Sequence, residues 1–116
     1  MRLIADILIG IVALLHAWFL VLEMFLWTRP LGRKVFRMSV EQAAATKTLA
    51  VNQGLYNGFL VAGLVWGLVG GDFHVKIFFL ACVVLAGVLG AMTVHRKVFF
   101  IQALPALIAL VLLHLH

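Results

Sequence analysis

Long apolar stretches separated by short polar connections run along the whole chain. A helix needs roughly 20 mainly apolar residues to cross the hydrocarbon core of a bilayer. Four stretches meet or approach that length and predict transmembrane helices over residues 3–27, 49–69, 74–94 and 98–115. We therefore expect an all-α, polytopic membrane protein in which residues 1–116 form a single domain, a compact four-helix bundle.

The composition strengthens the membrane prediction. Of the 116 residues, 66% are hydrophobic and only 11% carry a charge. A soluble domain of this length has no room for so much apolar surface in its core, because small domains bury the smallest fraction of their surface. The single cysteine, Cys82, excludes an internal disulfide and a zinc site built on cysteines.

The distribution of Lys and Arg predicts the orientation of the chain. Seven of these residues lie in two connections, 28–48 and 95–97, and two lie on the opposite side. By the positive-inside rule the basic connections face the cytoplasm, and both termini lie on the non-cytoplasmic side of the inner (plasma) membrane. The seven are Arg29, Arg33, Lys34, Arg37, Lys47, Arg96 and Lys97, and the two are Arg2 and Lys76.

The net charge of +5 also bears on the partners of this chain. Its cations flank the apolar stretches, as expected for residues that set topology and meet anionic lipid headgroups. No sequence signature of a nucleic-acid-binding fold accompanies them. We therefore expect membrane lipids as partners and no nucleic acid.

The first connection contains several signals for chain reversal and helix initiation. Pro30 is expected to stop the first helix, and Gly32 to permit the reversal that follows. Residues 33–38 mix cations with apolar side chains and are predicted to lie on the membrane surface. Ser39 and Gln42 have the spacing of a capping box, which predicts a helix that starts near residue 40.

Other local signals predict the ends and bends of the remaining helices. Asp72 is a predicted N-cap, and Pro105 is expected to kink the last helix and leave a carbonyl near Ile101 without its helical partner. Residues 95–97 are predicted to form a tight turn. Asp6 lies in the first turn of the first helix, where the helix dipole favours a carboxylate, so it requires no function.

Two polar residues of the first helix are left unexplained by capping or topology. Glu23 lies near the end of the helix, where the dipole disfavours a negative charge, and His16 lies in mid-span. Seven residues separate them, which places both on one face, about 10 Å apart along the axis. We predict them as candidate catalytic residues, with waters, a ligand or other side chains between them.

The second apolar stretch carries an unusually polar segment. Asn52 and Tyr56, and likewise Gln53 and Asn57, are neighbours at i,i+4 spacing, and the four together cover an arc of about 140°. They are predicted to hold the polar head of a ligand. Their alternative role is to join helices through interhelical hydrogen bonds.

Glycines repeat at four-residue spacing in the same stretch. Gly54 with Gly58, and Gly63 with Gly67, form two GxxxG motifs. Small residues at this spacing let a neighbouring helix come close. They predict tight helix packing and a possible homo-oligomer formed through these glycines.

The predicted threading gathers the polar residues in the cytoplasmic half of the bundle. Glu23 and Asn52 lie about one turn from the cytoplasmic face, and Gln102 of the fourth helix reaches the same depth. The outer halves of the helices are almost purely apolar. We therefore predict a polar intramembrane site with His16 and Glu23 on one wall. Its ligand-binding residues would be Asn52, Gln53, Tyr56, Asn57 and Gln102.

At these residues the chain resembles the small integral membrane proteins of the domain-of-unknown-function 1304 family. The resemblance rests on His16, on residues 23–27 (EMFLW), on residues 52–60 (NQGLYNGFL), and on Gln102 with residues 105–106. It covers essentially the whole chain. It implies a four-helix membrane protein of unassigned activity and carries no catalytic assignment.

Several functions fit this sequence. The preferred one is an integral membrane protein of unassigned activity, an enzyme or a ligand-binding protein, that binds or acts on a small or lipidic ligand at the polar site. A structural or partner-binding subunit is the first alternative, and proton- or ion-coupled transport by an oligomer is the second. A haem or metal site is disfavoured because His16 has no histidine at matching depth, so we expect no metal and no cofactor.

Overall fold

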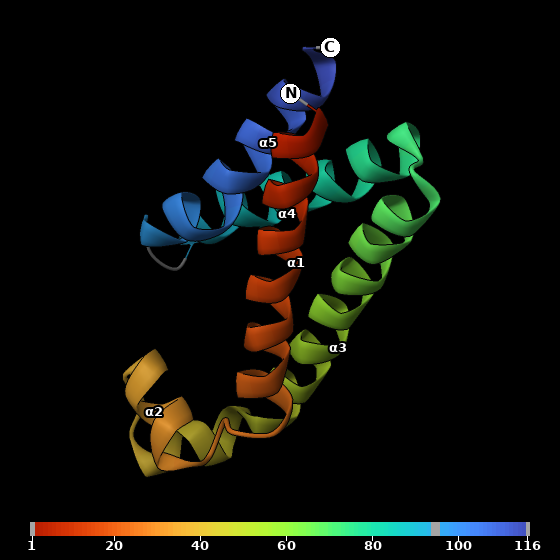
Figure 1. Cartoon of the computed structure of the whole chain (residues 1–116). Helices are drawn as coiled ribbons and strands as arrows, with labels where there is room; N and C mark the ends of the chain where they lie inside the picture. Colours follow the sequence, from red (N-terminus) through yellow and green to blue (C-terminus); the bar gives the residue numbers. More distant parts are fainter. Residues whose placement is uncertain (1, 94–95, 116) are drawn as a thin grey trace. The chain divides into compact units, whose positions relative to one another are not determined.

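The computed structural model describes residues 2–93 and 96–115, and it is all-α, as predicted (Figure 1). These residues contain five α-helices and one π-helix and no strand. The predicted turn at 95–97 begins at His95, which lies outside the described residues. The elements are α1 (Arg2–Met24), α2 (Pro30–Phe36), α3 (Val40–Gly70), α4 (Phe73–Thr93), the π-helix η1 (Phe99–Ala103) and α5 (Leu104–His114).

The helices divide into two compact units. Unit 1 consists of Met1–Leu14 with Leu60–His116, and unit 2 consists of Leu15–Phe59. Helices α1 and α3 each contribute to both units. The prediction of one domain stays a prediction, and the two units are described separately below.

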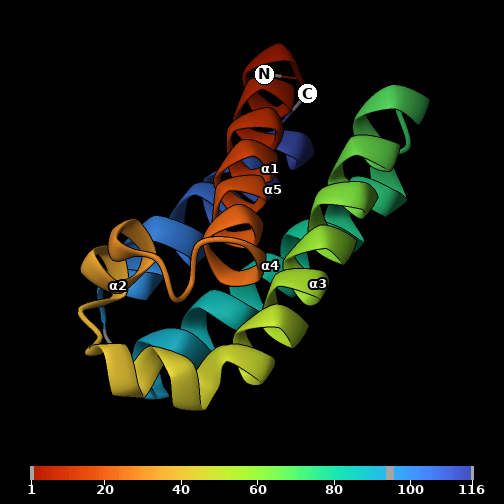
Figure 2. The ribbon, with the colours of Figure 1, turned by 90° about the horizontal axis from the view of Figure 1, so that it is seen from below.

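Unit 1 has an apolar core built from four helices. In both views of the ribbon the first turns of α1 lie beside the last turns of α5 (Figures 1 and 2). Small residues permit close packing: a Cβ atom added to Gly87 would lie 2.7 Å from Cβ of Ala103. The buried core residues are Ala5, Ile9, Val12, Ala13, Leu64, Leu80, Val83, Ala106, Ala109 and Leu113.

The first connection, in unit 2, folds differently from the prediction. Helix α1 ends at Met24, and Pro30 begins α2 because its fixed φ and missing N–H suit the first turn of a helix. Gly32 is buried within α2, where a Cβ atom would collide with the carbonyl oxygen of Leu26. Its role is therefore close packing of α2 on the preceding loop. The only described glycine with a positive φ is Gly71, at 61°.

Both predicted helix caps are confirmed. The backbone N–H of Ser39 donates to Oε1 of Gln42, and the backbone N–H of Gln42 donates to Oγ of Ser39, both at 3.0 Å. Asp72 Oδ1 accepts from the backbone N–H groups of His74 and Val75 at 3.0 and 3.1 Å. These bonds satisfy N–H groups that have no partner inside the helix.

The last helix is disturbed near Pro105, but the disturbance takes a different form from the predicted kink. The chain makes a π-helix over Phe99–Ala103, and the N–H of Leu104 donates to the carbonyl of Phe99, five residues earlier. A widened turn of this kind absorbs the register change that a proline imposes on a helix. Together η1 and α5 comprise 16 residues (Phe99–His114), or about 24 Å at 1.5 Å per residue.

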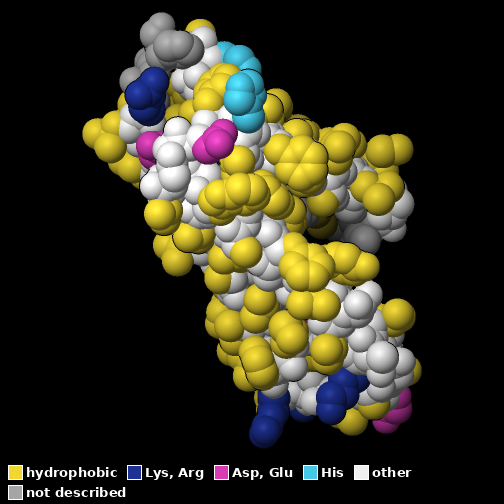
Figure 3. Space-filling model, turned by 90° about the vertical axis from the view of Figure 1, so that its right-hand side faces the viewer, with side chains coloured by type: hydrophobic (Ala, Val, Ile, Leu, Met, Phe, Trp, Pro, Cys, Tyr) yellow, Lys and Arg dark blue, Asp and Glu magenta, His cyan; other side chains and the backbone are white. Residues whose placement is uncertain are grey.

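Two helices, α1 and α4, are long and apolar enough to cross a membrane. Helix α3 has 31 residues, but its first half is polar, and Phe99–His114 is shorter than the roughly 30 Å of hydrocarbon. The structure therefore gives two candidate spans, and the four-span bundle stays a prediction. On the face drawn in Figure 3, hydrophobic side chains cover much of the surface, and charged side chains gather in small groups.

Candidate functional site

A carboxyl group and an amide meet inside unit 2. Glu23 lies in the last turn of α1, and Asn57 lies on α3. Nδ2 of Asn57 donates a hydrogen bond to Oε1 of Glu23. Asn57 is only 5% exposed, and Glu23 is partly buried. The acid that capping rules left unexplained is thus held by one of the four polar residues of α3.

Two glycines of α3 make this contact possible. A Cβ atom added to Gly54 would collide with Cγ of Met24 and lie 3.4 Å from Cβ of Glu23. One added to Gly58 would lie 3.1 Å from Cδ1 of Leu20. The missing side chains let α3 approach the end of α1, so that the short Asn57 side chain reaches the carboxyl group.

Beside Glu23 the end of α1, the loop that follows it and Lys47 of α3 line an open cavity of about 210 Å³. Its wall contains one carboxyl group, two cationic side chains and the indole of Trp27. Ligand pockets commonly begin at roughly 300 Å³, so this cavity suits a head group rather than a whole drug-sized molecule. The lining residues are Glu23, Met24, Phe25, Trp27, Thr28, Arg29 and Lys47.

Hydrogen bonds fix the loop that carries these lining residues. Nε1 of Trp27 donates to Oγ1 of Thr46 at 3.0 Å, and this hydroxyl donates to the carbonyl of Gln42 at 2.7 Å. The indole also packs on the ring of Phe36, with ring centroids 4.8 Å apart. Trp27 therefore ties the loop to α3 and to α2, which gives the cavity a defined wall.

His16 is fully buried but lies apart from this cavity. It continues the buried stripe of α1 formed by Ala5, Ile9 and Val12, at helical spacing. Its ring meets the edge of Phe19 at a centroid distance of 5.6 Å. Since α1 is continuous, two turns separate His16 from Glu23, and the described residues that line the cavity do not include His16.

The other predicted ligand-binding residues are not gathered at the cavity. Asn52, Gln53 and Tyr56 are exposed on α3, and Tyr56 is 53% exposed. Gln102 lies in η1, which belongs to unit 1, so its predicted approach to Glu23 stays a prediction. From the two predicted walls of the site, the structure joins Glu23 directly to Asn57.

Sequence reasoning missed the cationic part of the cavity. Arg29 and Lys47 were interpreted only as residues that set topology, yet both line the cavity with Glu23. Their sequence spacing gives no sign of this, because the loop after α1 brings them together. Trp27 could have indicated that the loop after the first helix belongs to the site, since it ends the EMFLW segment that also contains Glu23.

A second polar pair, in unit 1, was missed altogether. Nζ of Lys76 in α4 lies 2.8 Å from Oδ1 of Asp6 in α1. The lysine side chain is 5% exposed and that of Asp6 34%. A Cβ atom on Gly67 would lie 2.9 Å from Cγ of Lys76, so this glycine leaves room for the lysine stem. Asp6 therefore has a partner beyond the helix dipole.

The four glycines predicted to serve oligomerisation all face side chains of their own chain. Gly54 and Gly58 face α1 in unit 2, while Gly63 faces the ring of Phe79 and Gly67 faces Lys76 in unit 1. Their described role is packing within the chain. Homo-oligomerisation stays a prediction.

No group of three or more His, Cys, Asp or Glu side chains that could hold a metal ion occurs among the described residues. The side chains that line the unit 2 cavity offer proton-exchanging and cationic groups. Glu23 accepts hydrogen bonds or exchanges a proton, and Arg29 and Lys47 attract an anionic group.

Comparison with known proteins gives a family but no activity. The chain is 29% identical over 115 residues to the uncharacterized protein YpaA of Lactococcus lactis subsp. lactis (strain IL1403). This alignment covers 96% of this chain and 97% of YpaA. No solved structure matches. Residues 10–114 match the profile described as "Protein of unknown function (DUF1304)". Because that match spans nearly the whole sequence, the chain belongs to the DUF1304 family of proteins of unknown function.

Proposed function

We propose that this protein is an integral membrane protein that binds the polar head of a small or lipidic ligand in the unit 2 cavity. The observation that carries the proposal is the Glu23–Asn57 hydrogen bond at the wall of a cavity that also contains Arg29 and Lys47. A carboxyl group in an apolar helix is costly unless it is partnered or used. The Glu23 carboxyl group has Asn57 as its hydrogen-bond partner and also lines the cavity.

Exposed apolar surface supports the membrane part of the proposal. In the most apolar windows of α1 and α4, only 28% and 22% of residues are buried. Leu14 is 73% exposed, and Leu85 and Met92 are 70% and 79% exposed. The core helix of a soluble protein would be mostly buried, and continuous exposed apolar surface of this extent is characteristic of contact with lipid.

The charge distribution supports a cytoplasmic opening for the cavity. Arg29 and Lys47 belong to the basic connection that the positive-inside rule assigns to the cytoplasmic side. In a Cys82→Ser background, a cysteine at Arg37 should react with a membrane-impermeant maleimide only in inverted vesicles. A cysteine at Leu115 should react only in right-side-out cells. The reverse pattern would refute this orientation.

The lining predicts a head group with two complementary parts. Arg29 and Lys47 supply positive charge for an anionic group, and Glu23 accepts from a hydrogen-bond donor such as an ammonium. Asn57 occupies Oε1, so Oε2 is the atom that a ligand would meet. A zwitterionic head such as phosphoethanolamine combines both parts, and the ligand's chain would lie along apolar helix surface.

The test uses a fluorescent lysophosphatidylethanolamine and protein purified in a neutral detergent. We expect saturable binding that weakens roughly tenfold in Glu23→Gln and in Lys47→Gln, the change expected for one charge-assisted hydrogen bond. Glu41→Gln removes an exposed carboxylate from the same unit and serves as the matched control. Equal binding by all four proteins would refute the proposed site.

A second candidate function is partner binding through α3. Asn52, Gln53 and Tyr56 are exposed on α3, and polar side chains on a helix that meets lipid favour contact with another helix. Photocrosslinking from a benzoylphenylalanine at position 56 in cells tests this role. A discrete crosslinked protein band would support it, and crosslinking to lipid alone would refute it.

A further inference from the structure

A second cavity lies in unit 1, at the buried ion pair. Its volume is about 350 Å³, which falls at the lower end of the range for small-molecule sites. Three helices and the turn before α4 supply its wall. The lining residues are Arg2, Asp6, Gly71, Phe73, Lys76, Leu112 and Leu113, and we refer to this space as the Lys76 cavity.

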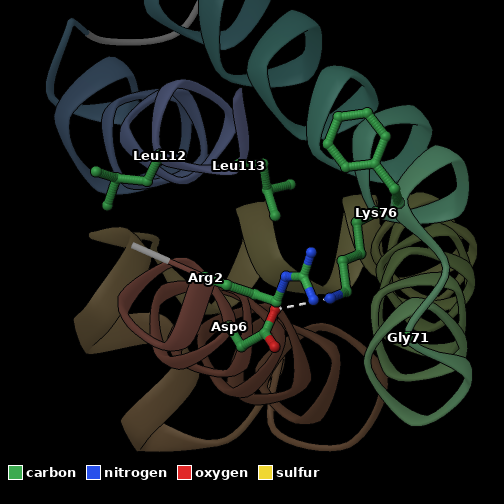
Figure 4. Close-up of a pocket in the computed structure, with 7 residues that line it drawn as sticks. Arg2, Asp6, Gly71, Lys76, Leu112 and Leu113 are labelled. Carbon is green, nitrogen blue, oxygen red and sulfur yellow. Dashed lines mark hydrogen bonds and ion pairs between the residues drawn. The ribbon is translucent and has the colours of Figure 1, made fainter. Parts of the chain in front are cut away.

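Two cations and one anion meet at one side of the Lys76 cavity. Figure 4 shows Arg2 and Asp6 of α1 and Lys76 of α4 with their charged groups directed toward one another. The Nζ–Oδ1 distance of 2.8 Å marks a direct ion pair between Lys76 and Asp6. That pair is neutral, so Arg2 gives this side of the cavity a net charge of about +1.

The remaining wall is apolar. Leu113 of α5 points toward the same space in Figure 4 and is only 6% exposed. Phe73 adds an aromatic ring, which His114 contacts edge-on at a centroid distance of 5.5 Å. Beyond the cavity, α1 and α5 expose apolar side chains, among them Leu3 and Val111, which are 72% and 52% exposed.

A structural role explains the ion pair but not the whole arrangement. Lys76 is held by Asp6 and by the space above Gly67, and the pair would join α1 to α4 without any ligand. Arg2 adds a second cation beside a pair that is already neutral, so the three side chains together carry one excess positive charge that a bound anion would balance. Its guanidinium offers the planar set of donors that suits carboxylate and phosphate groups.

From this geometry we infer that the Lys76 cavity binds the anionic head of an amphipathic molecule, a carboxylate or a phosphate attached to a hydrocarbon chain. Arg2 contacts the head directly, and Asp6 is a positioning residue that holds Lys76 toward it. The start of the chain lies against Phe73 and Leu113, and the rest runs along the exposed apolar surface of unit 1. The site is separate from the proposed unit 2 cavity and does not depend on it.

The experiment measures binding of 11-(dansylamino)undecanoic acid to the full-length protein in a neutral maltoside detergent. We expect decanoate to displace the probe and decanol, its uncharged analogue, to be at least tenfold weaker as a competitor. Phosphatidylglycerol and phosphatidylcholine vesicles then identify the source of the head. Displacement by decanoate alone points to a free fatty acid, and displacement by phosphatidylglycerol but not phosphatidylcholine points to an anionic lipid.

Variants separate the charge requirement from folding. Arg2→Gln changes an exposed side chain and should weaken probe binding roughly tenfold, while Arg2→Lys should restore most of it. Lys34→Gln removes one exposed cation of α2, which lines neither cavity, and is the matched control. Equal competition by decanol and decanoate, displacement by inorganic phosphate alone, or unchanged binding in Arg2→Gln would each overturn the inference.

Discussion

In each unit the described residues include a polar pair that links α1 to another helix, and the two pairs differ in chemistry. In unit 1, Asp6 and Lys76 are oppositely charged, and the lysine side chain is almost fully buried. In unit 2, Glu23 accepts from a neutral amide, Asn57. Each pair lies beside a glycine of α3 and borders a cavity.

The difference shows two ways to place an acid between apolar helices. Lys76 reaches Asp6 with a long stem, and Gly67 only has to leave room for that stem. Asn57 is short, so Gly54 and Gly58 must let the helices themselves approach. The first pair therefore depends on charge balance, and the second on the distance between helices. The predictions below test that contrast.

The largest effect is expected when the charge balance of unit 1 is broken. Asp6→Ala leaves Lys76 buried without its counter-charge and should lower the free energy of unfolding by about 2–3 kcal/mol. This loss is smaller than that usually caused by breaking a fully buried ion pair, because the Asp6 side chain is 34% exposed to water. Thermal unfolding in detergent, followed by circular dichroism, measures it. Adding Lys76→Met should recover most of the loss, and a double variant no more stable than Asp6→Ala would contradict the explanation.

In unit 2 the largest effect should come from separating the helices. Gly54→Val places a branched side chain against Met24 and Glu23 and should cost about 2 kcal/mol, as overpacking usually does. The same unfolding measurement applies. Gly10→Val is the matched control, because a Cβ atom there meets nothing within 4 Å, and its effect should stay within about 0.5 kcal/mol. Equal losses at both positions would contradict a cost set by close packing at Gly54, because Val has a higher helix propensity than Gly and propensity alone would produce no loss.

Removing the amide should cost less than removing a charge. Asn57→Ala leaves Oε1 of Glu23 without its donor and should lower the free energy of unfolding by about 1–2 kcal/mol. Replacing both partners, as Glu23→Leu with Asn57→Leu, should be nearly neutral for stability yet abolish binding of the proposed unit 2 ligand. If the double replacement costs more than the single one, the pair contributes to packing beyond its hydrogen bond.

The smallest effect should come from a feature that neither pair influences. Ser39→Ala removes the Oγ acceptor of the capping box and should cost about 1 kcal/mol, whatever residues stand at positions 6 and 57. Measured in the Asp6→Ala and Asn57→Ala backgrounds, its cost should add to theirs within about 0.5 kcal/mol. A strong departure from additivity would show that the cap is coupled to one of the pairs.

Local signals were sufficient for much of the secondary structure. The capping box at Ser39 and the N-cap at Asp72 act over three residues, so their partners are visible in the sequence, and both are confirmed. Pro30 was misassigned because a proline ends one helix and begins another with equal ease. Pro105 was expected to disturb the last helix, but the widened turn that results depends on packing around η1.

The candidate site was predictable only in part. Glu23 and Asn57 stood out because a carboxyl group or an amide in an apolar helix costs free energy. That cost can be judged from the residue and its neighbours in the sequence. Their pairing, and the exposure of Asn52 and Tyr56 on the same helix, depend on which face α3 turns inward. Side-chain direction around a helix that is apolar on nearly all sides cannot be read from periodicity.

The sequence by itself determined the all-α class, the helix caps, the family and the residues that are too polar for their apolar surroundings. The class, the caps and the unusually polar residues follow from composition or from contacts between near neighbours in the chain, and the family follows from similarity along residues 10–114. Only the tertiary structure decided that Lys76 meets Asp6, 70 residues away, and that Arg29 and Lys47 share a cavity with Glu23. Charges that sequence rules assign to topology can also line a cavity, because packing between distant segments decides which side chains meet.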